Sequence, residues 1–407
     1  MSRQYVPIPA PLLGVGHPLP VDLWAPSGQL LLRKGQTVQS AQHRERLAEH
    51  QASCTAADAL AWQRAYERAV HALLSQGADL DTVAQTPMPS EIRESDYVVG
   101  QQLHGGWLDL QEVLRGILYQ GGLAMNPLQR LAGIATKAQE LLDHDTDDSL
   151  YCLFQALARQ ELGYCPTHAL LCAVVCELSA RKLQVAPTVR AALFQAALVM
   201  NIGMGREQDS MARQASALTA WQRALIQEHP ARSVDILRGL GLDDPDVLDI
   251  VRWHHTPHAP EGLPANLLAR RILHLADSFV AKMAPRRTRA ALSSFKAVKS
   301  MVVGTAEADL GLGSAMAQAI SFYPPGTYVL LANGETAVSV QRGERANTPW
   351  VISVLDKHGV AISRLECKAT TTPAHTIQAA ATVDKVKVTL PVDKVRKARQ
   401  RIAGVQG

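Results

Sequence analysis

Residues 228–292 read EHPARSVDILRGLGLDDPDVLDIVRWHHTPHAPEGLPANLLARRILHLADSFVAKMAPRRTRAAL. Apolar residues recur here at helical spacing, which predicts several helices separated by short loops. The loops and helices carry a His-Pro pair, a histidine doublet and a later aspartate, namely His229, His254, His255 and Asp277. Histidine is the commonest transition-metal ligand in proteins, and a carboxylate is its usual companion. We therefore predict a metal site held between helices, or the remnant of one.

The overall composition is that of a soluble globular protein. The chain has 407 residues, of which 47% are hydrophobic and 19% charged, enough for two or three domains. A net charge of +4 argues against a nucleic-acid polymer as partner. No apolar run reaches the roughly 18 residues of a membrane span, and residues 1–4 do not begin a signal peptide. These features predict a cytoplasmic protein.

The six cysteines are scattered and form no CxxC motif. Cys172 and Cys176 lie four residues apart in an apolar stretch with helical periodicity. We interpret them as buried free thiols, with a zinc site as the alternative.

The first hundred residues predict a small β-rich module followed by a helix and a linker. In residues 1–55, short strands at 19–23 and 29–33 are separated by glycine turns. A helix over 37–50 follows. Residues 56–76 are amphipathic and predict another helix, whereas 77–104 contain prolines and mixed patterning typical of a linker. So small a β module needs a neighbour to pack on.

From residue 105 to 322, helical periodicity dominates, so the fold class is mainly α. The helices are expected at 107–119, 126–142, 147–162, 167–183, 188–199, 217–229, 231–238, 244–255, 265–282 and 289–301. Residues 323–407 predict a C-terminal β extension, with a hairpin at Asn333-Gly334 and strands at 328–332, 336–341, 350–355, 359–365 and 385–390. A basic tail over 391–401 is interpreted as solvated surface, with a phosphate or partner contact as the alternative.

Several further motifs stand in the same order as those of a known family. The chain has His168 in Pro-Thr-His-Ala, then Met200-Asn201-Ile202-Gly203-Met204, His229-Pro230, His254-His255, Gly262-Leu263-Pro264, Asp277, Arg286 and Arg289. This series resembles the HD-GYP family, a bacterial signalling branch of the HD-domain phosphohydrolases. The resemblance covers about 105–365, and the combination of motifs is specific.

The resemblance implies an HD-domain helical bundle that hydrolyses cyclic di-GMP with two metal ions. It implies metal ligands at His168, His229, His254, His255 and Asp277. It also implies that Arg286 and Arg289 face the substrate phosphates. Each residue has a simpler interpretation as well: His168 as a core histidine, Asp277 as a capping or exposed carboxylate, and the arginines as salt-bridge partners. His258 has no family counterpart and is expected to be an exposed loop residue.

Four positions depart from the family and weaken the expected chemistry. The family's His-Asp-Ile-Gly-Lys motif is Met200-Asn201-Ile202-Gly203-Met204 here, and its Gly-Tyr-Pro loop has Leu263 instead of tyrosine. A thioether is a poor ligand for Fe, Mn, Mg or Zn in an oxygen and nitrogen site. Asn201 lacks the negative charge that two ions would share. Tyr164 also stands where some family members carry a glutamate.

We therefore predict a degenerate HD-GYP signalling protein without phosphodiesterase activity. It would hold at most one weakly bound iron, manganese or zinc ion and act by binding cyclic di-GMP, a signalling protein partner, or both. One alternative is an active phosphodiesterase that uses a reduced metal site built from His229, His254, His255 and Asp277. Another is a regulatory scaffold with no nucleotide affinity, because Leu263 removes the aromatic ring of the signature loop.

Overall fold

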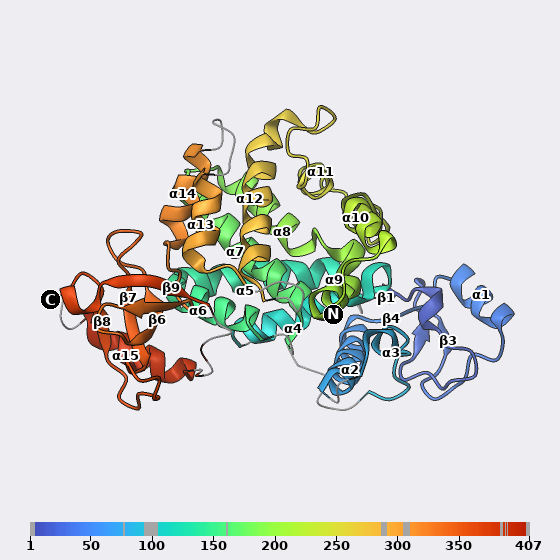
Figure 1. The fold of residues 1–407 in the computed structure, drawn as a ribbon. Coiled ribbons are helices and arrows are strands. Elements are labelled where there is room, and N and C mark those ends of the chain that lie inside the picture. Colours follow the sequence, from blue (N-terminus) through green and yellow to red (C-terminus); the bar gives the residue numbers. More distant parts are fainter. Residues whose placement is uncertain are drawn as a thin grey trace.

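The computed structural model describes residues 5–75, 78–92, 105–159, 162–285, 291–303, 310–382, 386, 388 and 390–403. A helical bundle forms the centre of the molecule, and a small β-containing module lies at each side of it (Figure 1). The mainly α fold class is confirmed.

The N-terminal module is a four-stranded antiparallel sheet with the strand order β1-β4-β2-β3. Its strands are β1 (Tyr5–Pro7), β2 (Leu23–Trp24), β3 (Leu30–Leu32) and β4 (Ser53–Thr55), and its helices are α1 (Ala41–Glu49), α2 (Ala56–Ser75) and α3 (Leu80–Ala84). The predicted strand over 19–23 is mostly irregular, because only Leu23 and Trp24 pair with neighbouring strands. The predicted linker over 77–104 contains α3, which Asp79 caps.

The N-terminal module is joined to the bundle by polar contacts as well as by apolar packing. The guanidinium of Arg206 donates to the Tyr66 hydroxyl at 2.6 Å, to the Val83 carbonyl at 2.9 Å and to the Tyr119 carbonyl at 2.7 Å. A buried ion pair joins Glu67 to Arg130. As expected for a module this small, it packs on its neighbour.

The helices of the bundle are α4 (Trp107–Gln120), α5 (Pro127–His144), α6 (Thr146–Leu157), α7 (Tyr164–Lys182), α8 (Pro187–Val199), α9 (Gly205–Arg213), α10 (Ala220–Gly239), α11 (Pro245–Trp253), α12 (Leu267–Met283), α13 (Ser294–Val303) and α14 (Leu310–Ile320). Most of them overlap a predicted helix, whereas α9 and α14 lie in segments where no helix was predicted. A short 3₁₀ turn over Ile202–Met204 joins α8 to α9.

Helix α7 is the centre of the hydrophobic core. Its residues are buried from Tyr164 to Ala180, so it has no solvent-facing side over that span. It packs against α4, α6, α8, α12 and α14. A helix that is apolar all round belongs in the interior of a domain. Any polar side chain on α7 is therefore held among neighbouring helices.

Two predicted helices are in fact one. The helices expected at 217–229 and 231–238 form the single helix α10, which continues through Pro230. A proline removes one backbone hydrogen bond and usually kinks or ends a helix. Here a capping box of Thr219 with Gln222 stabilises the N-terminus of α10, and tertiary packing buries its middle at His229, Pro230 and Ser233.

The C-terminal module is a five-stranded antiparallel sheet with the order β8-β7-β6-β5-β9. Its strands are β5 (Tyr328–Leu331), β6 (Thr336–Gln341), β7 (Trp350–Leu355), β8 (Cys367–Ala369) and β9 (Ile377–Ala381), followed by helix α15 (Val392–Ala403). The strand predicted over 359–365 is wrong, because that segment makes only an isolated bridge between Leu355 and Ala361. The strand predicted over 385–390 lies partly outside the described residues.

The basic segment at the C-terminus does more than cover surface. In α15, Arg399 pairs with Asp145 at 3.0 Å, and Arg396 pairs with Asp148 at 2.8 Å. Both acids lie at the start of α6, where Asp145 also caps the helix. Four of its basic residues are exposed, as the interpretation of the tail as solvated surface expects, but Arg396 and Arg399 also pair with the helical bundle.

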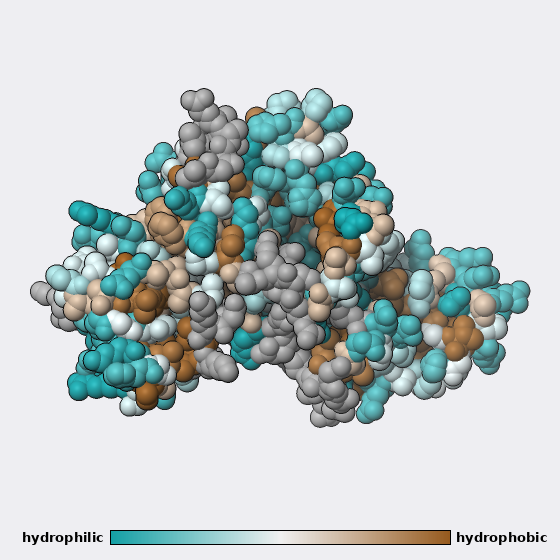
Figure 2. All heavy atoms as spheres, viewed as in Figure 1, coloured by the Kyte–Doolittle hydropathy of each residue, from teal (hydrophilic) through white to brown (hydrophobic). Residues whose placement is uncertain are grey.

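The outer surface carries hydrophilic residues over most of the face seen in Figure 2, with separate hydrophobic patches between them. Within the described residues, no helix combines the length and the apolar character needed to cross a bilayer.

Candidate metal centre

The structure brings all five predicted ligands into one region between four helices. His168 lies on α7, His229 on α10, the doublet His254-His255 follows the last turn of α11, and Asp277 lies on α12. His168, His229 and His254 are fully buried, whereas His255 is partly exposed and Asp277 is intermediate. Residues up to 109 positions apart in the chain are therefore neighbours here.

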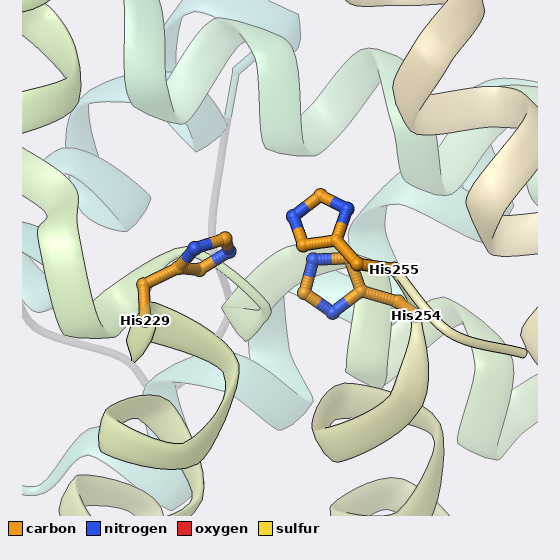
Figure 3. Close-up of side chains that lie close together, drawn as sticks. All are labelled: His229, His254 and His255. Atoms are coloured by element: carbon orange, nitrogen blue, oxygen red, sulfur yellow. The ribbon is translucent and has the colours of Figure 1, made fainter. Parts of the chain in front are cut away.

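Three imidazoles form the first of two clusters, which we call the histidine triad: His229, His254 and His255. Figure 3 shows their rings pointing toward one another from α10 and from the end of α11. The ring centroids of His229 lie 5.2 Å from those of His254 and 5.0 Å from those of His255, and the doublet's own rings are 4.1 Å apart. One ring nitrogen from each residue lies within 4.8 Å of the other two.

Hydrogen bonds to the backbone determine which nitrogen of the triad is free. Nδ1 of His229 contacts the Ile226 carbonyl at 2.8 Å, and Nδ1 of His254 contacts the Val251 carbonyl at 2.8 Å. A carbonyl only accepts, so each Nδ1 carries the proton and each Nε2 keeps its lone pair. Both Nε2 atoms are buried and have no hydrogen-bond partner. This is the arrangement that metal-binding histidines use.

Burial keeps these two imidazoles neutral. Burial and, to a smaller extent, the neighbouring His255 together lower the pKa of His229 to about 4 and that of His254 to about 3. At neutral pH, the lone pairs are therefore available to a cation rather than to a proton.

His168, Cys172 and Asp277 form the second cluster, which we call the mixed triad. Nε2 of His168 lies 2.8 Å from Oδ1 of Asp277 and 3.4 Å from Sγ of Cys172. The Tyr164 hydroxyl contacts Nδ1 of His168 at 3.1 Å. One atom from each member of the triad lies within 4.8 Å of the others.

Asp277 connects the two triads through its two oxygens. Oδ1 faces His168 in the mixed triad, and Oδ2 lies 4.0 Å from Nδ1 of His255 in the histidine triad. Burial by itself would raise the pKa of Asp277. The hydrogen bond with His168 and the surrounding histidines outweigh that effect and hold the pKa well below its usual range. The carboxylate is therefore charged and lies between the two clusters.

The residues that the resemblance marks as departures, Met200, Asn201 and Met204, lie at the end of α8 and in the 3₁₀ turn after it. Met200 and Asn201 are buried, and Nδ2 of Asn201 has no hydrogen-bond partner. Met204, where the family has a lysine, packs with Met211 and Leu225 in a small apolar cluster. This segment therefore presents an uncharged amide and two thioethers to the interior.

Gly203 explains how this turn reaches the centre despite the substitutions. A Cβ at this position would lie 2.8 Å from the His229 carbonyl oxygen and 2.9 Å from the Ser233 nitrogen. The Ser233 hydroxyl accepts from the Gly203 N–H at 3.0 Å and donates to the Met200 carbonyl at 2.8 Å. The turn is therefore hydrogen-bonded directly to the part of α10 that carries His229.

The loop Gly262-Leu263-Pro264 is held in place by contacts with Asp249 and Arg270, although it has leucine where the signature has tyrosine. Leu263 is 40% exposed, and its N–H donates to Asp249 at 2.8 Å. A Cβ at Gly262 would overlap the Arg270 guanidinium, which pairs with Asp249 at 3.2 Å. The loop thus retains its glycine for a steric reason, while Leu263 presents an aliphatic side chain to solvent.

The remaining predicted residues have different outcomes. Arg286 and Arg289 lie outside the described residues. His258 is exposed in a turn, as expected. Sequence reasoning missed Cys172 as a member of the site, although the four-residue spacing from His168 on one helix could have indicated it. It also missed His274, whose Nδ1 contacts the His254 carbonyl at 2.8 Å.

Residues 152–309 match the family model described as HD domain. This segment contains both triads, so the candidate metal centre lies in the part of the chain that is similar to HD domains. One solved structure that resembles the chain is Bd1817, a HDG"Y"P protein from Bdellovibrio bacteriovorus. The two are 14% identical, the comparison covers 77% of this chain and 98% of that one, and the TM-score is 0.38. No curated protein matches the chain.

The side chains present fit a transition-metal ion. Two buried imidazole nitrogens have lone pairs and no partner, and a charged carboxylate lies beside them. Imidazole and carboxylate are the donors that iron, manganese and zinc sites use. The histidine triad would hold one such ion, with Asp277 at its edge.

Proposed function

We propose that this chain is an HD-GYP-like signalling module that retains a metal centre but has lost hydrolysis of cyclic di-GMP. It would act by binding the dinucleotide, a protein partner, or both. The observation that carries the proposal is the pair of buried, unpartnered Nε2 atoms in His229 and His254. A buried polar atom without a partner costs roughly 1–3 kcal/mol, so its persistence supports a role in binding a cation.

The loss of hydrolysis follows from the environment of Asn201. Two divalent ions close together need an anion between them, because their charges repel. The amide of Asn201 has no charge to supply, and Nδ2 is a donor that repels a cation. Met200 adds no nitrogen, and Met204 adds no positive charge for a phosphate. When bound, a metal supplies Lewis acidity toward a phosphodiester, and these three side chains contribute nothing to that chemistry.

Binding of the ligand rests on fewer groups than in an active relative. We propose that Arg286 and Arg289, which follow α12 in the sequence, contact the phosphates, since arginine binds phosphate bidentately. The neutral histidines would add contacts through a bound ion. With the second ion absent or weak, we expect a dissociation constant in the micromolar range or above.

The test combines elemental analysis, hydrolysis and calorimetry on one preparation. We expect metal to bind after Mn²⁺, Fe²⁺ or Zn²⁺ is supplied, cyclic di-GMP to remain intact, and calorimetry to report salt-sensitive binding. The variant His229→Ala/His254→Ala should lose the ion held by the histidine triad and so bind fewer ions than the unmodified protein. The matched control His258→Ala, in an exposed turn, should keep it. Metal-dependent hydrolysis by the unmodified protein would overturn the proposal, as would a metal content in the double variant equal to that of the unmodified protein.

A second candidate function is favoured by the position of Asp277. Its two oxygens face both triads, so this carboxylate could serve two ions where Asn201 cannot. The chain would then be an active phosphodiesterase with a rearranged centre. Hydrolysis that disappears in Asp277→Asn while the fold is retained would select this candidate over the first.

A further inference from the structure

One face of α7 carries four residues with polar side chains at intervals of four. They are Tyr164, His168, Cys172 and Cys176, all buried. Residues four apart on a helix lie above one another, so a histidine and a cysteine at this spacing can hold the same ion. Helix α12 packs against α7 and brings Asp277 to the pair.

The distances in the mixed triad match those around a tetrahedral ion. Zinc lies about 2.0–2.1 Å from an imidazole nitrogen and about 2.3 Å from a thiolate sulfur. At a tetrahedral angle, these lengths put the two donors roughly 3.5 Å apart. Sγ of Cys172 lies 3.4 Å from Nε2 of His168. The carboxylate oxygen at 2.8 Å from Nε2 would need to move by only about half an ångström.

We propose that Cys172 is a metal ligand, and that His168, Cys172 and Asp277 form a thiolate site of the zinc class beside the histidine triad. The inference rests on the proposed function only in treating the region as a metal centre. It differs from the family resemblance, which implies no sulfur ligand.

The thiolate would supply a negative charge and a ligand atom, which Met200 and Asn201 do not provide. Cysteine binds metals as the anion, so Cys172 brings a negative charge to a region where Asn201 is neutral. Sulfur also favours Zn²⁺ over Mg²⁺ and Mn²⁺, so the two triads would differ in metal preference. The thioether of Met200 provides neither effect.

The protons are accounted for within the contacts already present. On binding, the Cys172 thiol loses its proton to solvent, as metal-bound cysteines do. In the metal-free protein, Nε2 of His168 donates its proton to the Asp277 carboxylate. On metal binding, this proton leaves Nε2 for solvent and Nδ1 takes up a proton from solvent, which it donates to the Tyr164 hydroxyl oxygen 3.1 Å away. The hydroxyl can act as donor or acceptor, so the same contact serves both states. Tyr164 thus acts as a positioning residue.

Cobalt provides a direct test, because a thiolate bound to Co²⁺ gives a charge-transfer band in the near ultraviolet that nitrogen and oxygen ligands do not give. The full-length protein is loaded with Co²⁺, and zinc affinity is measured by competition with a chelator. The variants are Cys172→Ser, which is nearly isosteric, and Cys176→Ser as the matched control, one turn along α7 and equally buried. Circular dichroism confirms that each is folded.

We expect the band in the wild type and in Cys176→Ser, and its loss in Cys172→Ser with a fall in zinc affinity of at least 10–100-fold. The variant His229→Ala/His254→Ala should keep the band, since it removes the other triad. Absence of the band from the wild type would overturn the proposal, as would its persistence in Cys172→Ser. Neither result depends on cyclic di-GMP hydrolysis, which tests the proposed function separately.

Discussion

At the scale of single residues, the centre is defined by how each donor atom is held. His229 and His254 are oriented by backbone carbonyls and turn bare Nε2 atoms toward each other. Asp277 is kept charged by its histidine neighbours. Asn201 has the opposite character, because it is buried and uncharged and has an unpartnered donor. The side of the centre formed by these histidines and Asp277 can therefore bind a cation, whereas Asn201 contributes no anion.

Asn201→Asp should make stability dependent on metal. The side chain is 2% exposed, so a carboxylate without a cation should cost about 3 kcal/mol in metal-free buffer. Supplying Mn²⁺ should recover this loss, and urea unfolding with and without the ion measures it. Met200→His alone should show much less recovery. If Met200→His/Asn201→Asp folds but holds no more metal than the wild type, the centre does not accept the family's ligands.

The pH dependence of the metal-free protein follows from the same histidines. In the unfolded chain, a histidine has a pKa of about 6.5, whereas burial lowers that of His229 to about 4 and that of His254 to about 3. Between these values, the unfolded state binds more protons. The free energy of unfolding is therefore at its full value above about pH 6.5. Below that pH, it falls by up to about 1.4 kcal/mol per pH unit for each of the two histidines.

Urea unfolding in chelator at about pH 7.5, 6 and 5 measures this slope. The variant His229→Asn/His254→Asn provides the comparison, because it removes both titrating groups. Equal slopes in the two proteins would contradict the assignment of the acid sensitivity to these residues.

At the scale of elements, the centre depends on close packing between the 3₁₀ turn Ile202–Met204 and α10. Gly203 lets the turn approach the His229 carbonyl, and Ser233 hydrogen-bonds to both sides of the turn. The continuity of α10 through Pro230 belongs to the same contact, since it keeps His229 and Ser233 on one rigid helix.

Gly203→Ala should therefore weaken both the fold and metal binding. The new methyl group would lie under 3 Å from backbone atoms of α10, and forced shifts of this kind cost about 1–3 kcal/mol. Gly239→Ala is the matched control, because nothing lies within 4 Å of its Cβ position and it ends the same helix. Thermal unfolding and elemental analysis provide the readouts. A Gly203→Ala protein as stable and as metal-rich as the control would show that the turn is free to move.

At the scale of the whole molecule, the centre is connected to both terminal modules. Arg206 follows the degenerate turn by two residues and contacts the N-terminal module at Tyr66 and Val83. On the other side, α15 pairs Arg396 and Arg399 with the start of α6. The HD segment therefore lies between two modules that are each attached through charged side chains.

Arg206→Met should loosen the N-terminal module and speed metal release. Three hydrogen bonds are lost and their partners stay partly buried, which should cost about 2 kcal/mol or more. Hydrogen exchange should become faster in α2 and α3, and metal transfer to a chelator should accelerate because α9 begins beside the turn. Arg223→Met, on exposed α10 surface, is the control. Faster hydrogen exchange without faster metal release would show that the attachment of the N-terminal module does not affect how the centre holds its metal.

The sequence by itself determined the helical bundle and the β character of both ends, and it nominated five candidate ligand positions, because periodicity and motif spacing are local properties. It could not show that His168 and Asp277, which are 109 positions apart, share a hydrogen bond, or that the carboxylate faces both triads. Only packing of α12 on α7 decides that. Only the tertiary structure places Cys172 beside His168 and Asp277, which is the basis for proposing it as a ligand, since a buried thiol and a ligand thiol have the same local sequence pattern.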